Sequence, residues 1–566
     1  MQIPAFLRSF YFRPRLLVHL HTYTRKDFGA DLAAGVTVGI VALPLAMAFG
    51  IASGVRPEQG IITAIIGGFL ISALGGSRVQ VGGPAGAFVA LLYGIAEKYG
   101  VANLLIATMM AGVMLFAMGA FKLGNLVRFV PVSIVIGFTN GIAIIVAISQ
   151  VKDFLGLAIA KAPSNFFSQV SAIASAIQTV NWFALAIGAM SLGIILLWPL
   201  SYEAQPSRAR RIMTKLPSTI VVLILSSLLV WFFKLPVETI GSKFGALPGG
   251  LPMPALPSFN WETAQNLVAP TIAIAFLCAI ESLLCARVAD GMIADRHDPN
   301  QELMAQGIAN FFSPFFGGIA ATGTIARTVT NVRSGARSPV AGIVHALVLF
   351  LIILVAAPLA SSIPLASLAA ILLWVAWSMG DWREFMKLGQ FSMFYRATLL
   401  STFALTVIFD LVVAIEVGLV LSSLFFIYRV SSLTKVQEIV LPPAIAHPAT
   451  GVHIAAYRIF GSLFFASVTK LEALLDPGGV LPKVVILELH QLINLDTTGL
   501  DALEKLHALL LKQGGHLLIA GATEQPLSLM KRGGFIAILG ENRVVDSLQD
   551  ALNIARELTA PAVVAT

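Results

Sequence analysis

Four residues within strongly apolar segments have side chains suited to anion binding or proton exchange: Glu281, Thr322, Thr324 and Arg327. A charged side chain inside a membrane is costly unless it is paired or faces a watery cavity. Arg327 is therefore a ligand for an anion, the partner of a structural carboxylate, or a residue whose head reaches the membrane surface. These three interpretations stay open at the level of the residue alone.

Arg327 lies in the run FFGGIAATGTIARTVTNVRSGARS, residues 315–338, which predicts a helix that begins halfway across a membrane. The small residues up to Gly323 favour extended or loop backbone, and a helical pattern follows from Thr324 until Arg333. Nine residues from Thr324 rise by about 14 Å, roughly half of a ~30 Å hydrocarbon core. The unpaired N–H groups at the start of this helix should then face a ligand near the midplane.

The composition places the chain among polytopic membrane proteins. The 566 residues are 57% hydrophobic and only 12% charged, and the mean hydropathy is +0.86, values that a soluble globular protein does not reach. The formal net charge of +8 comes mostly from short loops between apolar segments. Membrane topology explains these charges better than a nucleic-acid partner does.

Fourteen apolar segments are predicted, and the loops assigned to the interior carry more than twice as many Lys and Arg residues as the exterior loops. This bias favours an inner-membrane protein with both termini in the cytoplasm. We expect a cytoplasmic segment over 1–27, a transport domain over 28–430 and a second domain over 431–566. The segments lie near 31–50, 59–75, 84–96, 101–121, 130–150, 182–200, 217–233, 267–289, 302–316, 324–338, 339–360, 363–379, 396–412 and 413–428.

A second interruption, Gly82 to Phe88, matches the one before Arg327. Gly82 follows Pro44 of the first segment by 38 residues, and Ala321 follows Glu281 of the eighth segment by 40 residues. Two repeats of seven segments, about 28–233 and 267–430, would be inverted relative to each other, and paired interruptions in inverted repeats indicate a transporter's midplane site. The alternative is that small residues merely allow close helix packing.

Two helix N-termini directed at one place favour an anion, because both contribute free N–H donors and positive dipole ends. The hydroxyl groups of Thr322 and Thr324 are expected to add donors. Glu281, in the apolar run AIESLL, is a candidate for proton coupling, with a structural partnership to Arg327 as its alternative. Asp31 is expected near the end of the first segment, where a solvated carboxylate is ordinary.

The motifs resemble those of bacterial members of the sulfate permease (SulP) family over essentially the whole length. They are DLAAGVTVG at 31–39, ALPLAMAF at 42–49, VGGP at 81–84, AIESLLC at 279–285 and IARTVTN at 325–331. The resemblance implies fourteen spans in a seven-plus-seven inverted repeat, a core domain that moves against a gate domain, and homodimers. It places the anion site at Phe49, Ala85, Gly86, Ala87, Thr324, Ala326 and Arg327.

The sequences around Glu281 and Arg327 are most similar to proton-driven uptake systems, among them an enterobacterial C4-dicarboxylate transporter. The resemblance thus implies proton-coupled uptake of sulfate or a C4-dicarboxylate. Uncoupled or sodium-coupled exchange of bicarbonate or chloride is the alternative. Chloride-handling animal relatives tend to carry an aromatic residue where this chain has Ala85, so a roomier pocket is expected here.

After Arg429 the hydropathy falls, and short strand-like runs alternate with helical ones, which predicts an α/β domain. This tail resembles the STAS domain of the same family, which is similar to anti-sigma factor antagonists and implies a cytoplasmic protein partner. Thr498 holds the position that is phosphorylated in those antagonists. The simpler interpretation is that Asp496 or Thr497 caps the next helix.

No nucleotide-binding loop, catalytic triad or metal-ligand cluster stands out in the sequence. Cys278 and Cys285 lie seven residues apart on one predicted helix, about 10 Å along its axis, which is too far for a disulfide. We therefore expect a transporter without enzymatic activity, cofactor, metal or nucleic-acid partner.

Overall fold

The computed structural model describes residues 12–125, 131–159, 163, 165–198, 217–257, 261–409, 411–442, 446, 453–472 and 482–559. The chain divides into two compact units, Met1–Leu419 and Val420–Thr566. The division falls within helix α22 (Leu411–Leu433), which also contains the expected boundary at 430.

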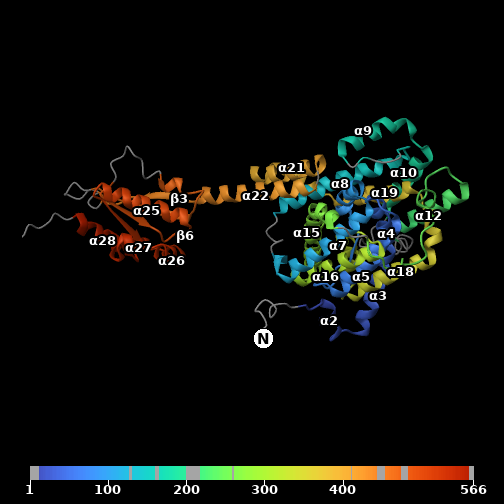
Figure 1. Cartoon of the computed structure of the whole chain (residues 1–566), viewed down its shortest axis with the longest axis horizontal. Helices are drawn as coiled ribbons and strands as arrows, with labels where there is room; N and C mark the ends of the chain where they lie inside the picture. The colour runs from blue at the N-terminus through green and yellow to red at the C-terminus, as the bar shows by residue number, and fades with distance from the viewer. Residues whose placement is uncertain are drawn as a thin grey trace, which may run out of the picture. The chain divides into compact units, whose positions relative to one another are not determined.

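The first unit is helical, and its first seven predicted segments correspond to helices interrupted at the expected place. Helix α4 (Figure 1) continues through a π-helical turn, η1 (Thr63–Gly67), into α5. The elements are α3 (Arg25–Ala52), α4 (Pro57–Ile62) with α5 (Gly68–Leu74), β1 (Gly82–Gly83) with η2 (Gly86–Phe88) and α6 (Val89–Tyr99), α7 (Val101–Ala120), α8 (Val132–Leu155), α10 (Trp182–Leu197) and α12 (Ser218–Phe233).

The second set of seven segments follows the same order, with its short strand again ahead of the third helix. The elements are α15 (Val268–Ile293), α16 (Pro299–Phe312) with η5 (Ser313–Phe316), β2 (Thr322–Gly323) with α17 (Ile325–Arg333), α18 (Val340–Ala360), α19 (Leu365–Met379), α21 (Met393–Ile408) and α22. The predicted start of the tenth segment is correct to one residue, since Thr324 is the N-cap of α17.

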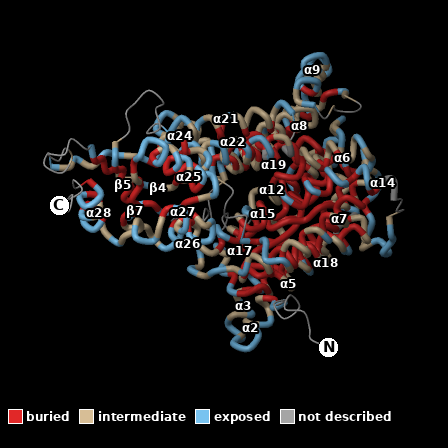
Figure 2. Tube along the Cα trace, turned by 60° about the vertical axis from the view of Figure 1, so that its left-hand side comes forward, coloured by how far each residue is buried: buried red, intermediate tan, exposed pale blue. Residues whose placement is uncertain are grey.

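Helix packing within this unit separates two groups. Helix α16 packs on α7 and α18 packs on α3, whereas α19 and α21 both pack on α8. The first group contains both interruptions and forms the core domain, and the second forms the gate domain. Among the described residues, six helices are long and apolar enough to cross a membrane by themselves. Buried residues are concentrated around α7 and α15 (Figure 2).

Several helices were not expected from the sequence. Helix α9 (Phe166–Ala176) lies between the fifth and sixth segments, and α13 (Ile240–Phe244) and α14 (Trp261–Asn266) lie between the seventh and eighth. Helix α2 (Arg15–Leu20) precedes the first segment, where Arg15 pairs with Asp295 at 2.8 Å.

The second unit is an α/β domain around a six-stranded sheet. The strand order is β3-β4-β5-β7-β8, and β6 pairs with β4. Strand β3 is antiparallel to β4, and the other pairings are parallel. The strands are β3 (Lys435–Ile439), β4 (Ile454–Leu463), β5 (Val484–Glu488), β6 (Leu492–Leu495), β7 (His516–Ala520) and β8 (Val544–Val545).

Side chains alternate between the two faces of this sheet, as the two-residue period of strands requires. Val485 and Leu487 of β5 join a cluster with α25, α26 and α27, whereas Val484 and Ile486 join another with α28. The sheet is therefore covered by helices on both sides. These helices are α24 (Thr469–Glu472), α25 (Thr497–Lys512), α26 (Glu524–Arg532), α27 (Phe535–Leu539) and α28 (Leu548–Thr559).

Candidate anion-binding site

The two interruptions meet. Strands β1 and β2 pair antiparallel, with Gly82 opposite Gly323 and Gly83 opposite Thr322. The N–H group of Thr324 extends the ladder by donating to the Val81 carbonyl at 3.0 Å, and the N–H group of Val81 donates to the Thr328 hydroxyl at 3.0 Å. Two segments about 240 residues apart in the chain are thus held together immediately before their helices begin.

Both helices start with backbone donors that have no acceptor within the helix. In α17 the first intrahelical bond is from Thr328 N–H to Thr324 O, so the N–H groups of Ile325, Ala326 and Arg327 precede it. In η2 the first is from Phe88 N–H to Ala85 O. Neither start has a side-chain cap. The two positive helix ends are therefore available to an anion.

The Arg327 side chain lies against the backbone of β1. It is 1% exposed, and its Nη1 donates to the Gly82 carbonyl at a long 3.4 Å. A Cβ atom at Gly83 would lie 1.8 Å from Nη1, and Gly83 has φ +151°, a conformation that side chains disfavour. Gly83 is thus required for the arginine to occupy this place.

Arg327 has no carboxylate partner among the described residues. Its Nη2 is buried without any hydrogen-bond partner. A buried, always charged guanidinium with an unused donor is costly in the empty protein. The structural carboxylate and the membrane-surface alternatives are both absent from this structure, because the guanidinium is enclosed and unpaired.

The remaining predicted site residues gather at the two helix starts. A Cβ atom at Gly86 would lie 3.2 Å from the Phe49 ring and 2.8 Å from Met379 Sδ. Phe49 and Ala87 are buried, and Ala85 is 8% exposed. Met379, at the end of gate helix α19, was not foreseen, since one methionine in an apolar segment gives no sequence signal.

The hydroxyl groups of Thr322 and Thr324 already donate to backbone carbonyls, so they are not free to donate to an anion. The Thr324 hydroxyl donates to Val81 O at 3.0 Å, and the Thr322 hydroxyl donates to Cys278 O at 3.2 Å. Each hydroxyl proton is therefore engaged with backbone and holds the strand pair in place. In this geometry the donors that remain at the α17 start are backbone N–H groups and the guanidinium.

Glu281 lies on α15 between two contacts of that helix with the site. Cys278, one turn earlier, accepts from Thr322, and Cys285, one turn later, donates from Sγ to the Thr328 hydroxyl at 3.2 Å. Glu281 is 9% exposed and has no hydrogen bond or ion pair with any described residue. The structural pairing of Glu281 with Arg327 is therefore absent here.

Three polar residues on one face of α16 brace the site from behind. Asn310 binds both the N–H and the carbonyl of Ala321, just before β2, at 2.8 Å each. Gln306 donates to Ser282 at 2.8 Å. Glu302, fully buried, accepts from Ser282, Gln306 and the N–H groups of two residues that follow α5, Gly76 and Ser77.

Asp31 differs from its prediction as a solvated carboxylate, because it is 0% exposed. It accepts hydrogen bonds from the Tyr23 hydroxyl at 2.8 Å, from the N–H groups of Arg337 and Ser338, and from the Ser338 hydroxyl. The residue therefore ties the start of α3 to the loop that follows α17.

Accessible space adjoins one of the two helix starts. Ala326 and Ile325 are exposed, so the first turn of α17 faces accessible space. A separate cavity of about 720 Å³ begins at Ile51, two residues beyond Phe49, and at Val89 of α6. Charged residues line it, among them Arg56, Glu97, Lys152, Asp153 and Lys243.

In the α/β domain, Thr498 is exposed in the first turn of α25. The capping interpretation holds for Asp496, whose side chain accepts from Gly499 N–H at 2.8 Å. Asp496 also accepts from Phe465 N–H at 3.2 Å, which fixes the turn that presents Thr498.

Comparison with known families explains this arrangement. Residues 28–402 match the Sulfate permease family, and residues 448–551 match the STAS domain. This chain belongs to the sulfate permease family. It is 40% identical over 526 residues to "Putative sulfate transporter YvdB" of Bacillus subtilis, covering 93% of this chain and 97% of that protein. It is 32% identical over 429 residues to "Bicarbonate transporter BicA" of Picosynechococcus, covering 73% of each.

Solved structures show the same fold. The chain matches SLC26A9 with a TM-score of 0.82 at 19% identity, over 96% of this chain and 92% of that one. It matches the transmembrane domain of a cyanobacterial BicA with a TM-score of 0.61 at 30% identity, over 71% and 98%. The predicted family and fold are confirmed: fourteen spans in a seven-plus-seven inverted repeat of core and gate domains, followed by a STAS domain. This sulfate permease homologue is a multi-pass membrane protein and an anion transporter.

Proposed function

We propose that this sulfate permease homologue is a secondary-active transporter that takes up sulfate or a C4-dicarboxylate together with protons. The anion binds between the starts of η2 and α17, beside Phe49, Ala85, Gly86, Ala87, Thr324, Ala326 and Arg327. The observation that carries the proposal is the β1–β2 pair, which brings two uncapped helix starts to one place beside a buried, unpaired arginine.

The electrostatics favour an anion with more than one unit of charge. Two helix ends contribute partial positive charge, and Arg327 adds a full charge that no described carboxylate neutralises. Because the site lies within a low-dielectric core, these charges act more strongly than they would in water. A bound anion would also supply the acceptor that Arg327 Nη2 lacks.

Glu281 is the proposed coupling residue. With Glu281 ionised and a dianion bound, Glu281, Arg327 and the anion together carry two negative charges. Protonation of Glu281 reduces this sum to one negative charge. The core domain with its bound anion therefore moves through the membrane at a lower electrostatic cost. Glu281 has no fixed hydrogen-bond partner that would hold it in one protonation state.

Substrate choice rests on the small residue at Ala85 and on the names of relatives. Ala85 leaves more room between the helix starts than an aromatic residue would, which suits sulfate or a dicarboxylate. The YvdB relative is named for sulfate and the BicA relative for bicarbonate. Bicarbonate exchange, uncoupled or coupled to sodium, is therefore the second candidate.

The test is uptake into proteoliposomes that contain the purified protein. An inward proton gradient should accelerate uptake of labelled sulfate or succinate, and Glu281→Gln should remove this acceleration. Glu416→Gln, at an exposed position of α22, should leave it intact. If the gradient does not change wild-type uptake, proton coupling is wrong.

A competition panel identifies the anion. Unlabelled sulfate, succinate, fumarate, aspartate, bicarbonate and chloride are offered against the transported label, with and without sodium. Strongest competition by bicarbonate together with sodium dependence would favour the second candidate. Binding of none of these anions would contradict the site itself.

The remaining parts of the proposal concern the assembly. From the family resemblance, the protein forms a homodimer in the cell inner membrane with both termini in the cytoplasm. The STAS domain binds a cytoplasmic protein, and Thr498 is its candidate phosphorylation site. Deletion of 434–566 that abolishes partner capture but preserves uptake would give the domain a role separate from transport.

A further inference from the structure

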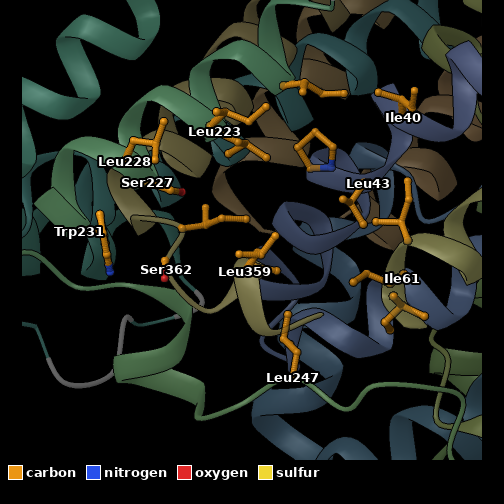
Figure 3. A pocket seen from close by; sticks show the side chains of 17 residues that line it. Ile40, Leu43, Ile61, Leu223, Ser227, Leu228, Trp231, Leu247, Leu359 and Ser362 are labelled. Atoms are coloured by element: carbon orange, nitrogen blue, oxygen red, sulfur yellow. The ribbon is translucent and has the colours of Figure 1, made fainter. Parts of the chain in front are cut away.

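An apolar cavity of about 700 Å³ lies between core helices α3 and α18 and gate helix α12, away from the residues proposed to bind the anion (Figure 3). Its volume falls within the range of small-molecule pockets. Ile40, Leu43 and Pro44 of α3, Leu223 and Ser227 of α12, and Ile353 of α18 are among the residues that line it.

The cavity runs from an exposed rim to a buried floor. Leu228, Trp231 and Leu359 at the rim are 55%, 71% and 74% exposed. Ile61 and Ile353 at the floor are 1% and 2% exposed. Because α12 and α18 are membrane-spanning helices, exposed apolar side chains on them face lipid, and the cavity opens onto the hydrocarbon.

The lining excludes the transported anion and disfavours water. Every lining residue is uncharged, and the polar side chains are those of Ser227, Ser362 and Trp231. The Ser227 hydroxyl is buried without a hydrogen-bond partner in the described structure. An ordered water needs two to four polar partners, which this lining does not assemble.

We propose that the cavity binds one acyl chain of a bilayer phospholipid, which enters sideways between α12 and α18. The acyl chain is the apolar ligand supplied at the rim at the highest concentration, and it fills a space that the side chains leave open. Because the lining comes from both core and gate domains, the bound chain separates the surfaces that move during transport. It also contacts α3, the helix that carries Phe49, at the proline that interrupts its hydrogen bonding.

The inference is tested with full-length protein in liposomes containing a phospholipid with a diazirine in one acyl chain. After illumination, mass spectrometry should find the label on lining residues of α12 and α18, such as Leu223 and Ile353. The mapping in wild-type protein does not depend on any variant being folded.

Two variants of one helix supply the matched comparison. Ser227→Trp fills the cavity and should lower labelling of the lining at least fivefold. Leu225→Trp adds the same ring to the same helix at a residue outside the lining. This variant should change the labelling of the lining residues less than twofold. Equal labelling in both variants, or wild-type labelling that is no higher at the lining than at Leu225, would overturn the proposal.

A second copy of the chain is the other occupant that the experiment distinguishes. In that case the lining would stay unlabelled in wild-type protein, and Leu228→Cys would give a disulfide-linked dimer. Labelling of the lining together with monomeric Leu228→Cys supports the lipid. Neither outcome depends on which anion is transported, so the proposed function and this inference succeed or fail separately.

Discussion

At the scale of single residues, Arg327 and Gly83 act as one unit. The guanidinium occupies the volume in which a Gly83 side chain would lie, and the backbone of Gly83 has a positive φ. Arg327 has no carboxylate partner among the described residues, which supports the proposal that it binds the anion.

Replacing the glycine should therefore displace the arginine. Gly83→Ala should abolish saturable anion binding and lower stability by about 1–3 kcal/mol, because a strained conformation is added to a direct clash. Calorimetric titration and thermal unfolding measure the two effects. In Gly94→Ala, in α6, the added Cβ meets nothing within 4 Å. This variant should retain anion binding, and its free energy of unfolding should rise by about 0.5–1 kcal/mol. Equal behaviour of both variants would contradict the assignment.

Substitution of Arg327 distinguishes an anion-binding role of this residue from a structural role. Arg327→Gln should weaken sulfate or succinate binding by about tenfold or more, since a hydrogen bond to a charged group contributes about 1.5–3 kcal/mol. It should not lower the melting temperature of the empty protein, because it removes a buried unpaired charge. Arg333→Gln, at the exposed end of the same helix, is the control. A large loss of stability without loss of binding would favour a structural role.

Residue types predicted some of the site and not the rest. Arg327 and Glu281 were recognisable because charge is rare in apolar segments. Asp31 was misjudged because its place near a helix start looks solvated, whereas its burial comes from the loop after α17, some 300 residues away. Asn310 and Gln306 gave no signal, since amides are common in both packed and functional positions.

At the scale of elements, the site depends on a rigid support for two short strands. A pair of two-residue strands has too few hydrogen bonds to be stable alone. Asn310 on α16 binds both backbone groups of Ala321, and thus fixes the segment that leads into β2.

Removing this amide should destabilise the core domain. Asn310→Ala leaves the buried Ala321 N–H without a partner, at about 1–3 kcal/mol, and leaves the Ala321 carbonyl with only the weaker donor of the Cys278 thiol. We expect the thermal unfolding midpoint to fall by several degrees and anion binding to weaken with it. Asn103→Ala, which loses only a bond to a carbonyl in its own neighbourhood, should shift the midpoint much less. If both variants melt alike, Asn310 does not brace the site.

Element boundaries were predictable where composition changes sharply. The glycine-rich runs placed both interruptions, and the start of α17 was correct to one residue. The pairing of β1 with β2 was not predictable, because two residues carry no strand periodicity. Helix α9 was missed because it lies outside the long apolar runs and half of its residues are exposed.

At the scale of the whole molecule, the chain has two units with separate hydrophobic cores. The sequence distinguished them because hydropathy falls where strand-like alternation begins. The STAS unit has its own sheet, covered on both faces, so residues 434–566 should fold without the transport unit. This independence makes its pH response measurable in isolation.

Two histidines should make that unit less stable in acid. Burial and the nearby Arg543 charge lower the pKa of His507, which packs edge-on against Phe535. Burial, Arg543 and Lys483 lower the pKa of His516. Because the unfolded chain then binds protons at a higher pH than the folded domain does, stability is full above about pH 6.5 and falls as the pH drops below it.

The measurement is thermal unfolding of the 434–566 fragment between pH 7.5 and pH 5. We expect the melting temperature to fall by several degrees between pH 7.5 and pH 5. The double variant His507→Gln/His516→Gln should show a smaller decrease in melting temperature over the same range. His490→Gln, at an exposed position, should leave the wild-type profile unchanged. A melting temperature that rises on acidification would contradict the sign, because it requires the folded domain to bind the additional protons. In the full-length protein, an acid-dependent loss of partner capture that His507→Gln/His516→Gln prevents and Glu281→Gln does not would trace to these two histidines.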